Sequence, residues 1–134
     1  MICQHGIRIL SDEVYRLLEH DPNDRLPAMA ESYDKGLSLV TMSKPWGGCG
    51  ITIGWLAFQD LGIKQALVDV QYFGTACPGR ATEIQAIMTL RASDTILEKN
   101  LGIIRKYKQP SSCFDLSSFS GRYVIALPSL TDRL

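Results

Sequence analysis

Two short apolar runs, residues 7–10 and 37–41, constrain the fold of this chain more than any other feature. Their aliphatic and β-branched side chains predict two buried strands. The first run leads into Asp12, and the second leads into Ser43 and Lys44. Ligands of open α/β sheets bind beyond the carboxyl ends of the strands, so we expect these polar side chains to share one site.

The rest of the chain predicts a third strand, two helices and a possible last strand. The third strand spans residues 51–58, and Asp60 then suits the N-cap of a helix over 61–72. A longer helix is expected over about 80–106, and residues 122–127 form the possible last strand. This order predicts an α/β fold with a sheet flanked by helices.

The length of the chain limits how complete this fold can be. With 134 residues, it is one domain or part of one. Buried strands need helices over both faces of the sheet, and the sequence predicts too few helices for that. We therefore expect a piece of a larger α/β domain.

The charge pattern argues against several classes of partner. The chain has 14 basic and 14 acidic residues, and their interleaving leaves no basic stripe to hold nucleic acid. No apolar run reaches the length of about 18 residues that a membrane helix needs. Arg8 and Asp12 interrupt the segment in which a signal peptide would be apolar. The sequence thus predicts a soluble cytoplasmic protein that binds neither nucleic acid nor membrane.

The cysteines predict neither a metal site nor a disulfide framework. They are widely separated, and His5 and His20 add no spacing typical of metal ligands. Without a secretory signal, we expect free and mostly buried thiols. The four positions are Cys3, Cys49, Cys77 and Cys113.

Lys44 is the most reactive candidate side chain. A lysine that leaves a buried strand is partly desolvated, loses proton affinity and can attack an aldehyde to form an imine. The carboxylate of Asp12 is a possible partner at the same edge of the sheet. Three structural alternatives remain open: a surface role for Lys44, a turn cap for Asp12, and simple ring packing for Tyr15.

The segment after Lys44 is rich in glycine and tryptophan. Its glycines follow the lysine and do not precede a helix, so a tight turn is a better interpretation than a phosphate cradle. We expect Trp46 and Trp55 to be packing residues.

Three segments carry a resemblance to a known family: Ser11-Asp-Glu-Val-Tyr15, Thr41-Met-Ser-Lys44 and Gly50-Ile-Thr-Ile-Gly-Trp55. They resemble consecutive motifs of the fold type I aminotransferases of class I and II, which use pyridoxal 5'-phosphate. The resemblance implies that residues 1–106 are the C-terminal half of the family's large domain, with the interdomain helix. It implies that residues 107–134 are a divergent remnant of the small domain, and that the protein forms a homodimer.

The resemblance also implies roles for individual residues. Lys44 matches the lysine that holds the cofactor as an internal aldimine and then moves a proton between the substrate and the cofactor. Asp12 matches the aspartate that pairs with the pyridine nitrogen, so that the ring acts as an electron sink. Tyr15 matches the tyrosine that hydrogen-bonds the phenolic oxygen. Thr41 matches a hydroxyl that contacts the phosphate, and Ser43 is expected to bind the cofactor with it.

One position departs from the family pattern. The family usually has an arginine eight residues after the lysine, within Gly-x-Arg-x-Gly, and this chain has Thr52 there. A threonine donates one hydrogen bond but carries no charge, so we expect weaker phosphate binding unless another cation compensates.

The resemblance implies transfer of an amino group between an amino acid and a 2-oxo acid, impaired by truncation of the chain. The first alternative is a catalytically inactive fragment that acts as a self-associating interaction module. The second is an atypical pyridoxal-phosphate enzyme that acts on arginine, because the segment 43–50 with Thr52 resembles an atypical branch of the family.

Overall fold

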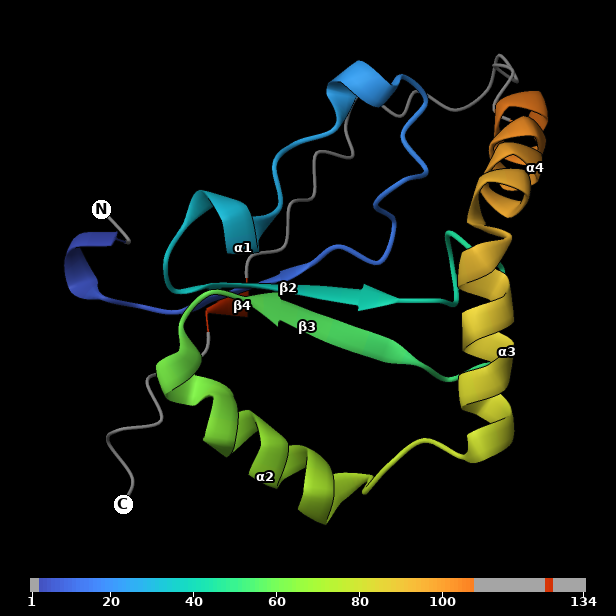
Figure 1. Ribbon diagram of the computed structural model, residues 1–134. Coiled ribbons are helices and arrows are strands. Elements are labelled where there is room, and N and C mark those ends of the chain that lie inside the picture. Colours follow the sequence, from blue (N-terminus) through green and yellow to red (C-terminus); the bar gives the residue numbers. More distant parts are fainter. Residues whose placement is uncertain (1–2, 108–124, 127–134) are drawn as a thin grey trace.

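A mixed four-stranded sheet forms the centre of the computed structural model, which describes residues 3–107 and 125–126 (Figure 1). Strand β1 (Ile9–Asp12) pairs in parallel with β2 (Gly36–Thr41). Strand β3 (Gly54–Phe58) is antiparallel to β2, and the short β4 (Ile125–Ala126) is antiparallel to β1. The order β3-β2-β1-β4 confirms the expected α/β class.

Helices lie over both faces and at one end of this sheet. The short α1 (Met29–Ser32) packs on β2, and α2 (Lys64–Gly74) lies over the opposite face (Figure 1). Helices α3 (Arg80–Arg91) and α4 (Ser93–Tyr107) stack beyond the end at which β2 finishes. Three 3-10 turns complete the described part, at Cys3–His5, Pro22–Asp24 and Leu61–Ile63.

Asp60 caps the segment that leads into α2, as the sequence predicts. Its carboxylate accepts from the backbone N–H of Gly62 at 3.0 Å and pairs with the guanidinium of Arg8 at 3.0 Å. The hydrogen bond from Arg8, with that from Gly62, holds the pKa of Asp60 below its usual value. Arg8 precedes β1, so this pair ties the start of β1 to the start of α2.

Two sequence expectations about element boundaries are wrong. The helix expected over 80–106 is divided at Ala92, whose backbone (φ −96°, ψ 16°) leaves the helical region. The strand expected from residue 51 begins only at Gly54, because Thr52 adopts a left-handed backbone with φ 45°, which ends strand pairing on its N-terminal side.

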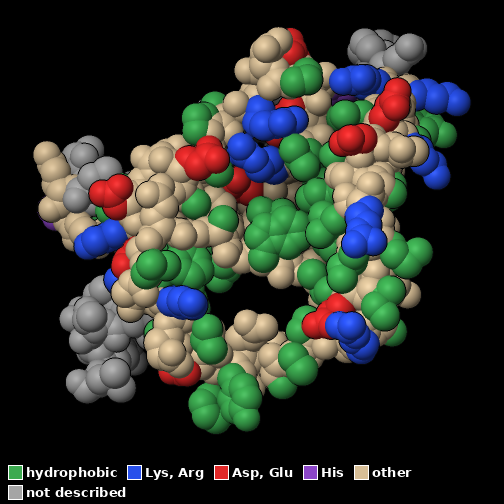
Figure 2. Space-filling view, in the orientation of Figure 1, with side chains coloured by type: hydrophobic (Ala, Val, Ile, Leu, Met, Phe, Trp, Pro, Cys, Tyr) green, Lys and Arg blue, Asp and Glu red, His purple; other side chains and the backbone are tan. Residues whose placement is uncertain are grey.

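The buried core is small in the described part of the chain. Met42, Trp46 and Ala86 form its main cluster, and Ala30 and Leu37 are buried elsewhere. Large apolar side chains lie exposed along α2 and α3, where Figure 2 shows green side chains on the surface. In a larger α/β domain, further layers would cover such surface. The exposed set includes Val68, Val70, Tyr72 and Phe73 on α2 and Ile84, Ile87, Met88 and Leu90 on α3.

The expectation of mostly buried thiols is wrong for two of the cysteines. Cys49 and Cys77 are free, as expected, but both are exposed. Each lies in a loop, after Lys44 and after α2 respectively, where the surrounding chain does not cover it. The side chains of Cys3 and Cys113 lie outside the described residues.

Over residues 3–107 and 125–126, no helix is both long and apolar enough to cross a membrane. No cluster of histidine, cysteine, aspartate and glutamate suited to a metal ion occurs there either.

Candidate functional site

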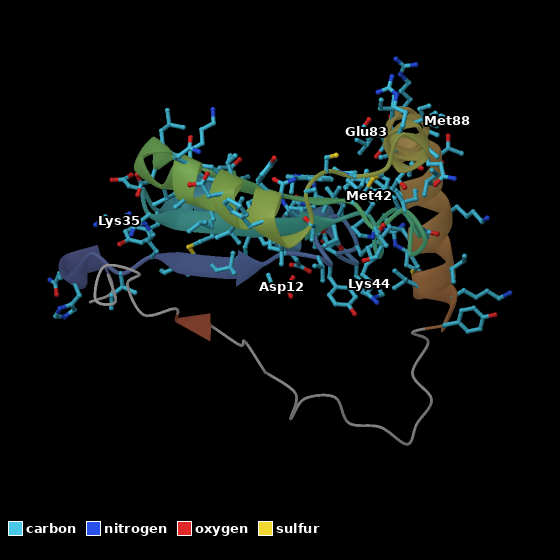
Figure 3. All side chains as sticks on the ribbon, turned by 90° about the horizontal axis from the view of Figure 1, so that it is seen from below. Asp12, Lys35, Met42, Lys44, Glu83 and Met88 are labelled. Atoms are coloured by element: carbon cyan, nitrogen blue, oxygen red, sulfur yellow. The ribbon has the colours of Figure 1, made fainter. Side chains whose placement is uncertain are left out.

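The candidate residues gather at the end of the sheet toward which β1 and β2 both run. Asp12 is the last residue of β1, and Thr41 is the last residue of β2. Parallel pairing sets Asp12 beside Leu39, and the backbone N–H of Glu13 donates to the Leu39 carbonyl at 2.9 Å. Lys44 follows three residues after the end of β2, so both ionisable groups lie at this end of the sheet (Figure 3).

Asp12 is exposed and makes a local turn contact. Its Oδ1 atom accepts from the backbone N–H of Val14 at 3.2 Å, which is the cap that the structural alternative anticipates. The carboxylate nevertheless stays accessible at the strand end. It is therefore able to accept a further hydrogen bond from a bound molecule.

Lys44 is exposed, which corrects the expectation of a desolvated lysine. Its immediate neighbourhood is buried all the same, because Met42 is 0% exposed and the side chain of Pro45 is fully buried. The lysine therefore has a fixed backbone and a free amine. The turn that follows is tight: Gly47 (φ 63°) donates to the Lys44 carbonyl at 3.2 Å, and Gly48 donates to the Met42 carbonyl at 3.0 Å.

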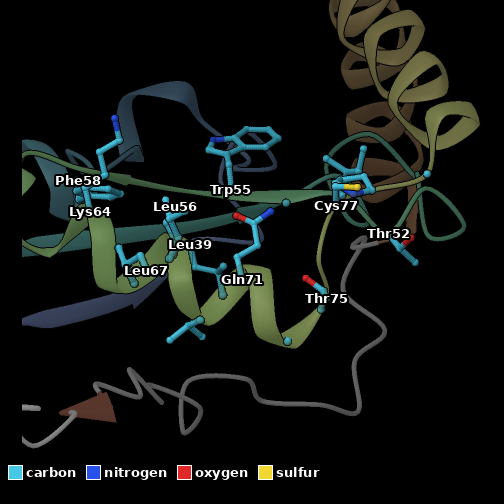
Figure 4. A pocket seen from close by; sticks show the side chains of 17 residues that line it. Leu39, Thr52, Trp55, Leu56, Phe58, Lys64, Leu67, Gln71, Thr75 and Cys77 are labelled. Atoms are coloured by element: carbon cyan, nitrogen blue, oxygen red, sulfur yellow. The ribbon is translucent and has the colours of Figure 1, made fainter.

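The three candidate hydroxyl residues fall into two groups. Thr41 Oγ1 and Ser43 Oγ lie 2.8 Å apart, within hydrogen-bond distance, immediately before Lys44. Thr52 is exposed beyond the glycine-rich turn, and it lines a different space, between β3 and α2 (Figure 4). The structure thus brings the hydroxyls of Thr41 and Ser43 together. Thr52 takes no part in this hydrogen bond.

Tyr15 lies on a series of turns after β1 and is 64% exposed, so it is not the packed ring of the structural alternative. Glu19 holds this segment by accepting from the backbone N–H of Leu17, which has a left-handed backbone (φ 76°), and by pairing with Arg25. Burial acts to raise the pKa of Glu19, but the hydrogen bonds from Arg25 and the backbone outweigh it, so the pKa is lowered.

Glu13 organises the backbone behind the candidate residues, and the sequence analysis missed it. Its Oε1 atom accepts from Ser38 Oγ at 2.7 Å and from the backbone N–H of Met29 at 2.9 Å. Its other oxygen pairs with Arg16 at 3.4 Å. Glu13 thereby joins the end of β1 to β2 and to the start of α1. The available signal was its place beside Asp12 in the first motif.

Two residues of α4 were also missed, and they hold the turn after Lys44. The indole N–H of Trp46 donates to Ser93 Oγ at 2.7 Å, and Asn100 Nδ2 donates to the Pro45 carbonyl at 2.8 Å. The rings of Trp46 and Trp55 lie 5.9 Å apart. Trp46 is buried, in line with the packing role predicted for it, whereas Trp55 is 39% exposed. The available signal was the seven-residue spacing of Ser93 and Asn100, which puts them on one helix face.

A cavity of about 1030 Å³ separates β3 from α2 (Figure 4). Its walls are mostly apolar, with Trp55 and Leu56 on the strand side and Leu67 and Val68 on the helix side. Gln71 adds a polar side chain from α2.

Comparison with known proteins agrees with the motifs at this site. The family model for aminotransferase class I and II matches residues 1–109. A crystal structure of a pyridoxal-phosphate-dependent aminotransferase from Streptococcus suis is 32% identical in sequence, with a TM-score of 0.70. The match covers 78% of this chain and 27% of that one, so the chain spans about a quarter of its length. No curated protein matches the chain. The family match covers most of the sequence, and the chain therefore belongs to the class I and II aminotransferases.

Proposed function

We propose that this chain carries the cofactor lysine of a pyridoxal-phosphate-dependent aminotransferase, which transfers an amino group between an amino acid and a 2-oxo acid. One observation carries the proposal. Asp12 ends β1, Lys44 follows the adjacent parallel strand β2, and both lie at the same end of the sheet, in the order of the family motifs. This is the place where ligands of open α/β sheets bind.

The side chains at this end of the sheet fit the chemistry of pyridoxal 5'-phosphate at three of its groups. Lys44 offers a free amine for the aldehyde, and Asp12 offers an accessible carboxylate for the pyridine nitrogen. Thr41 and Ser43 offer paired hydroxyls for the phosphate. Thr52 adds no charge, so the phosphate would be held by hydrogen bonds alone from these positions. When bound, the cofactor supplies an electron sink for chemistry at the substrate α-carbon.

Each residue then has a defined task. Asp12 would accept a hydrogen bond from the pyridine nitrogen, and its negative charge would favour the protonated form of that nitrogen. Tyr15 would donate a hydrogen bond to the phenolic oxygen of the ring. Lys44 would hold the cofactor and would act as the general base toward the substrate α-carbon.

The domain division and the partners belong to the same proposal. Residues 1–106 would be the C-terminal half of the large domain, with α3 and α4 leading toward the small domain, and 107–134 would be a remnant of that domain. An amino acid, a 2-oxo acid and a second copy of the chain are the proposed partners. The family match supports the two substrate classes.

A labelling experiment tests the cofactor lysine. The full chain is incubated with pyridoxal 5'-phosphate, reduced with borohydride, digested and analysed by mass spectrometry. We expect modification at Lys44 in preference to Lys35, Lys64 and Lys99, and less of it in Asp12→Asn. Equal labelling of Lys44 and these three reference lysines would reject the proposal, because it would show ordinary surface reactivity.

The inactive, self-associating fragment is the second candidate. The many exposed apolar side chains of α2 and α3 favour it, because association would remove them from water. Sedimentation of the full chain at micromolar concentration tests this candidate. A dimer that shows no preference for Lys44 in the labelling experiment would support it, and a monomer would exclude it.

A further inference from the structure

The backbone on both sides of Lys44 is held by contacts from other segments of the chain and by the neighbouring Pro45. On the N-terminal side, Met42 is buried and its N–H donates to the Ile53 carbonyl at 3.0 Å. On the C-terminal side, the ring of Pro45 restricts Lys44 to extended conformations. The carbonyl of Pro45 then accepts the hydrogen bond from Asn100 at 2.8 Å.

Three residues of α4 that contact this turn lie on one face of the helix. Ser93, Ile96 and Asn100 are spaced by three and four residues and so lie on one side of the helix. Ile96 packs against the cluster that contains Met42 and Trp46. The apolar contact thus lies between two hydrogen bonds, from Trp46 to Ser93 and from Asn100 to Pro45.

Asn100 also lies against the turn itself. A side-chain carbon placed at Gly47 would come within 3.6 Å of Asn100 Nδ2. Gly47 in turn donates to the carbonyl of Lys44. The backbone of Lys44 is therefore connected to α4 through Gly47 and Asn100. Asn100 lies 56 residues after Lys44 in the sequence.

We propose that Ser93 and Asn100 are positioning residues, which fix the turn that carries Lys44 and thereby aim its amine at the cofactor. The inference rests on the proposed function of Lys44 and deepens it. Because Lys44 itself is exposed, no packing around its side chain fixes it, and the backbone beneath it sets the point from which its flexible side chain extends. Movement of α4 would then be transmitted to the amine.

Two substitutions remove the contacts without touching Lys44. Ser93→Ala removes the acceptor for the Trp46 indole, while Ser93→Thr keeps a hydroxyl. Asn100→Ala removes the donor to Pro45. Lys99→Ala, at an exposed neighbour on α4, is the matched control. Circular dichroism of each full-length variant first establishes that it is folded.

The first measurement is amide hydrogen exchange at Gly47 and Gly48, with Ala57 in β3, which pairs with Ser38, as the reference. We expect exchange at the two glycines to be about two- to tenfold faster in Ser93→Ala and Asn100→Ala, the range for one lost hydrogen bond. Exchange at Ala57 should not change. The second measurement is borohydride-fixed labelling with pyridoxal 5'-phosphate, expressed as Lys44 relative to Lys64.

Labelling at Lys44 should fall by about two- to tenfold in the two alanine variants and recover in Ser93→Thr. Lys99→Ala should behave as the wild type. Unchanged exchange at Gly47 and Gly48 would overturn the inference, and so would faster exchange with unchanged Lys44 labelling. If the wild type itself shows no preference for Lys44, the proposed function fails, and with it the aiming role, even where the exchange data show that α4 holds the turn.

Discussion

Arg8 and Asp60 form an ion pair of 3.0 Å that joins the residue before β1 to the cap before α2, across 52 positions of sequence. Because the pKa of Asp60 is lowered in the folded chain, the pair stabilises the fold above the unfolded pKa of the carboxyl group. This contribution is lost as the pH falls through the lowered folded value.

The first prediction follows from that pair. Asp60→Asn keeps an oxygen that can cap Gly62 but removes the titrating charge. We expect the urea midpoint of the variant to change less than that of the wild type between neutral pH and about pH 3. Urea unfolding at both pH values measures the difference, and equal pH dependence in the two proteins would contradict it.

The second prediction concerns the network around Glu13. Ser38 is 1% exposed, donates to Glu13 and accepts from the backbone N–H of Ala30 at 3.0 Å. Ser38→Ala leaves the buried Ala30 N–H without this acceptor and removes one hydrogen bond from the partly buried Glu13, so the free energy of unfolding should fall by about 1–3 kcal/mol. Ser32→Ala, on the exposed side of α1, is the control and should stay within about 0.5 kcal/mol. Urea unfolding of both variants measures the two changes in the free energy of unfolding, and equal changes would contradict the prediction.

The third prediction contrasts two glycines. A side chain at Gly36 would overlap the carbonyl oxygen of Met29, because α1 crosses β2 there. Gly36→Ala should therefore lower the free energy of unfolding by about 1–3 kcal/mol. Gly102 in α4 has nothing within 4 Å of the added carbon, so Gly102→Ala should raise it by about 0.5–1 kcal/mol. Thermal melting of both variants shows whether the melting temperature falls in Gly36→Ala and rises in Gly102→Ala. A change in the same direction in both variants would contradict the prediction.

The fourth prediction addresses the missing phosphate charge. Thr52→Arg introduces a guanidinium at the position where the family usually has one. If the proposed function holds, a charge-assisted bidentate contact should tighten binding of pyridoxal 5'-phosphate by about tenfold or more. Thr95→Arg adds the same charge on the exposed surface of α4 and should leave the affinity unchanged. Titration of both variants, followed by labelling at Lys44, makes the comparison.

Local sequence signals predicted much of the fold correctly. The apolar runs gave β1 and β2 within two residues, because buried strands need aliphatic side chains whatever surrounds them. Asp60 was predicted as a cap because its carboxylate acts on a backbone N–H only two residues away. The glycine-rich turn was likewise decided by its own residues, with Gly47 at a positive φ.

The missed features depend on residues far apart in sequence. The contact between Trp46 and Ser93 spans 47 positions, and no local pattern in either segment specifies the other. The exposure of Lys44 depends on which elements cover the sheet end, and a buried strand before it does not determine that. The break at Ala92 and the left-handed Thr52 are backbone choices that neither residue type favours on its own.

The order β3-β2-β1-β4 leaves β3 with a neighbour on one side alone within the described part of the chain. Its outer edge presents a row of main-chain donors and acceptors about as long as the strand itself, Gly54–Phe58. An extended peptide that reaches this edge finds a template for continuing the sheet, whether it comes from the same molecule or from another. The edge of β3 is therefore a second place, besides the exposed apolar side chains of α2 and α3, at which this chain can associate without involving the residues that would perform the chemistry.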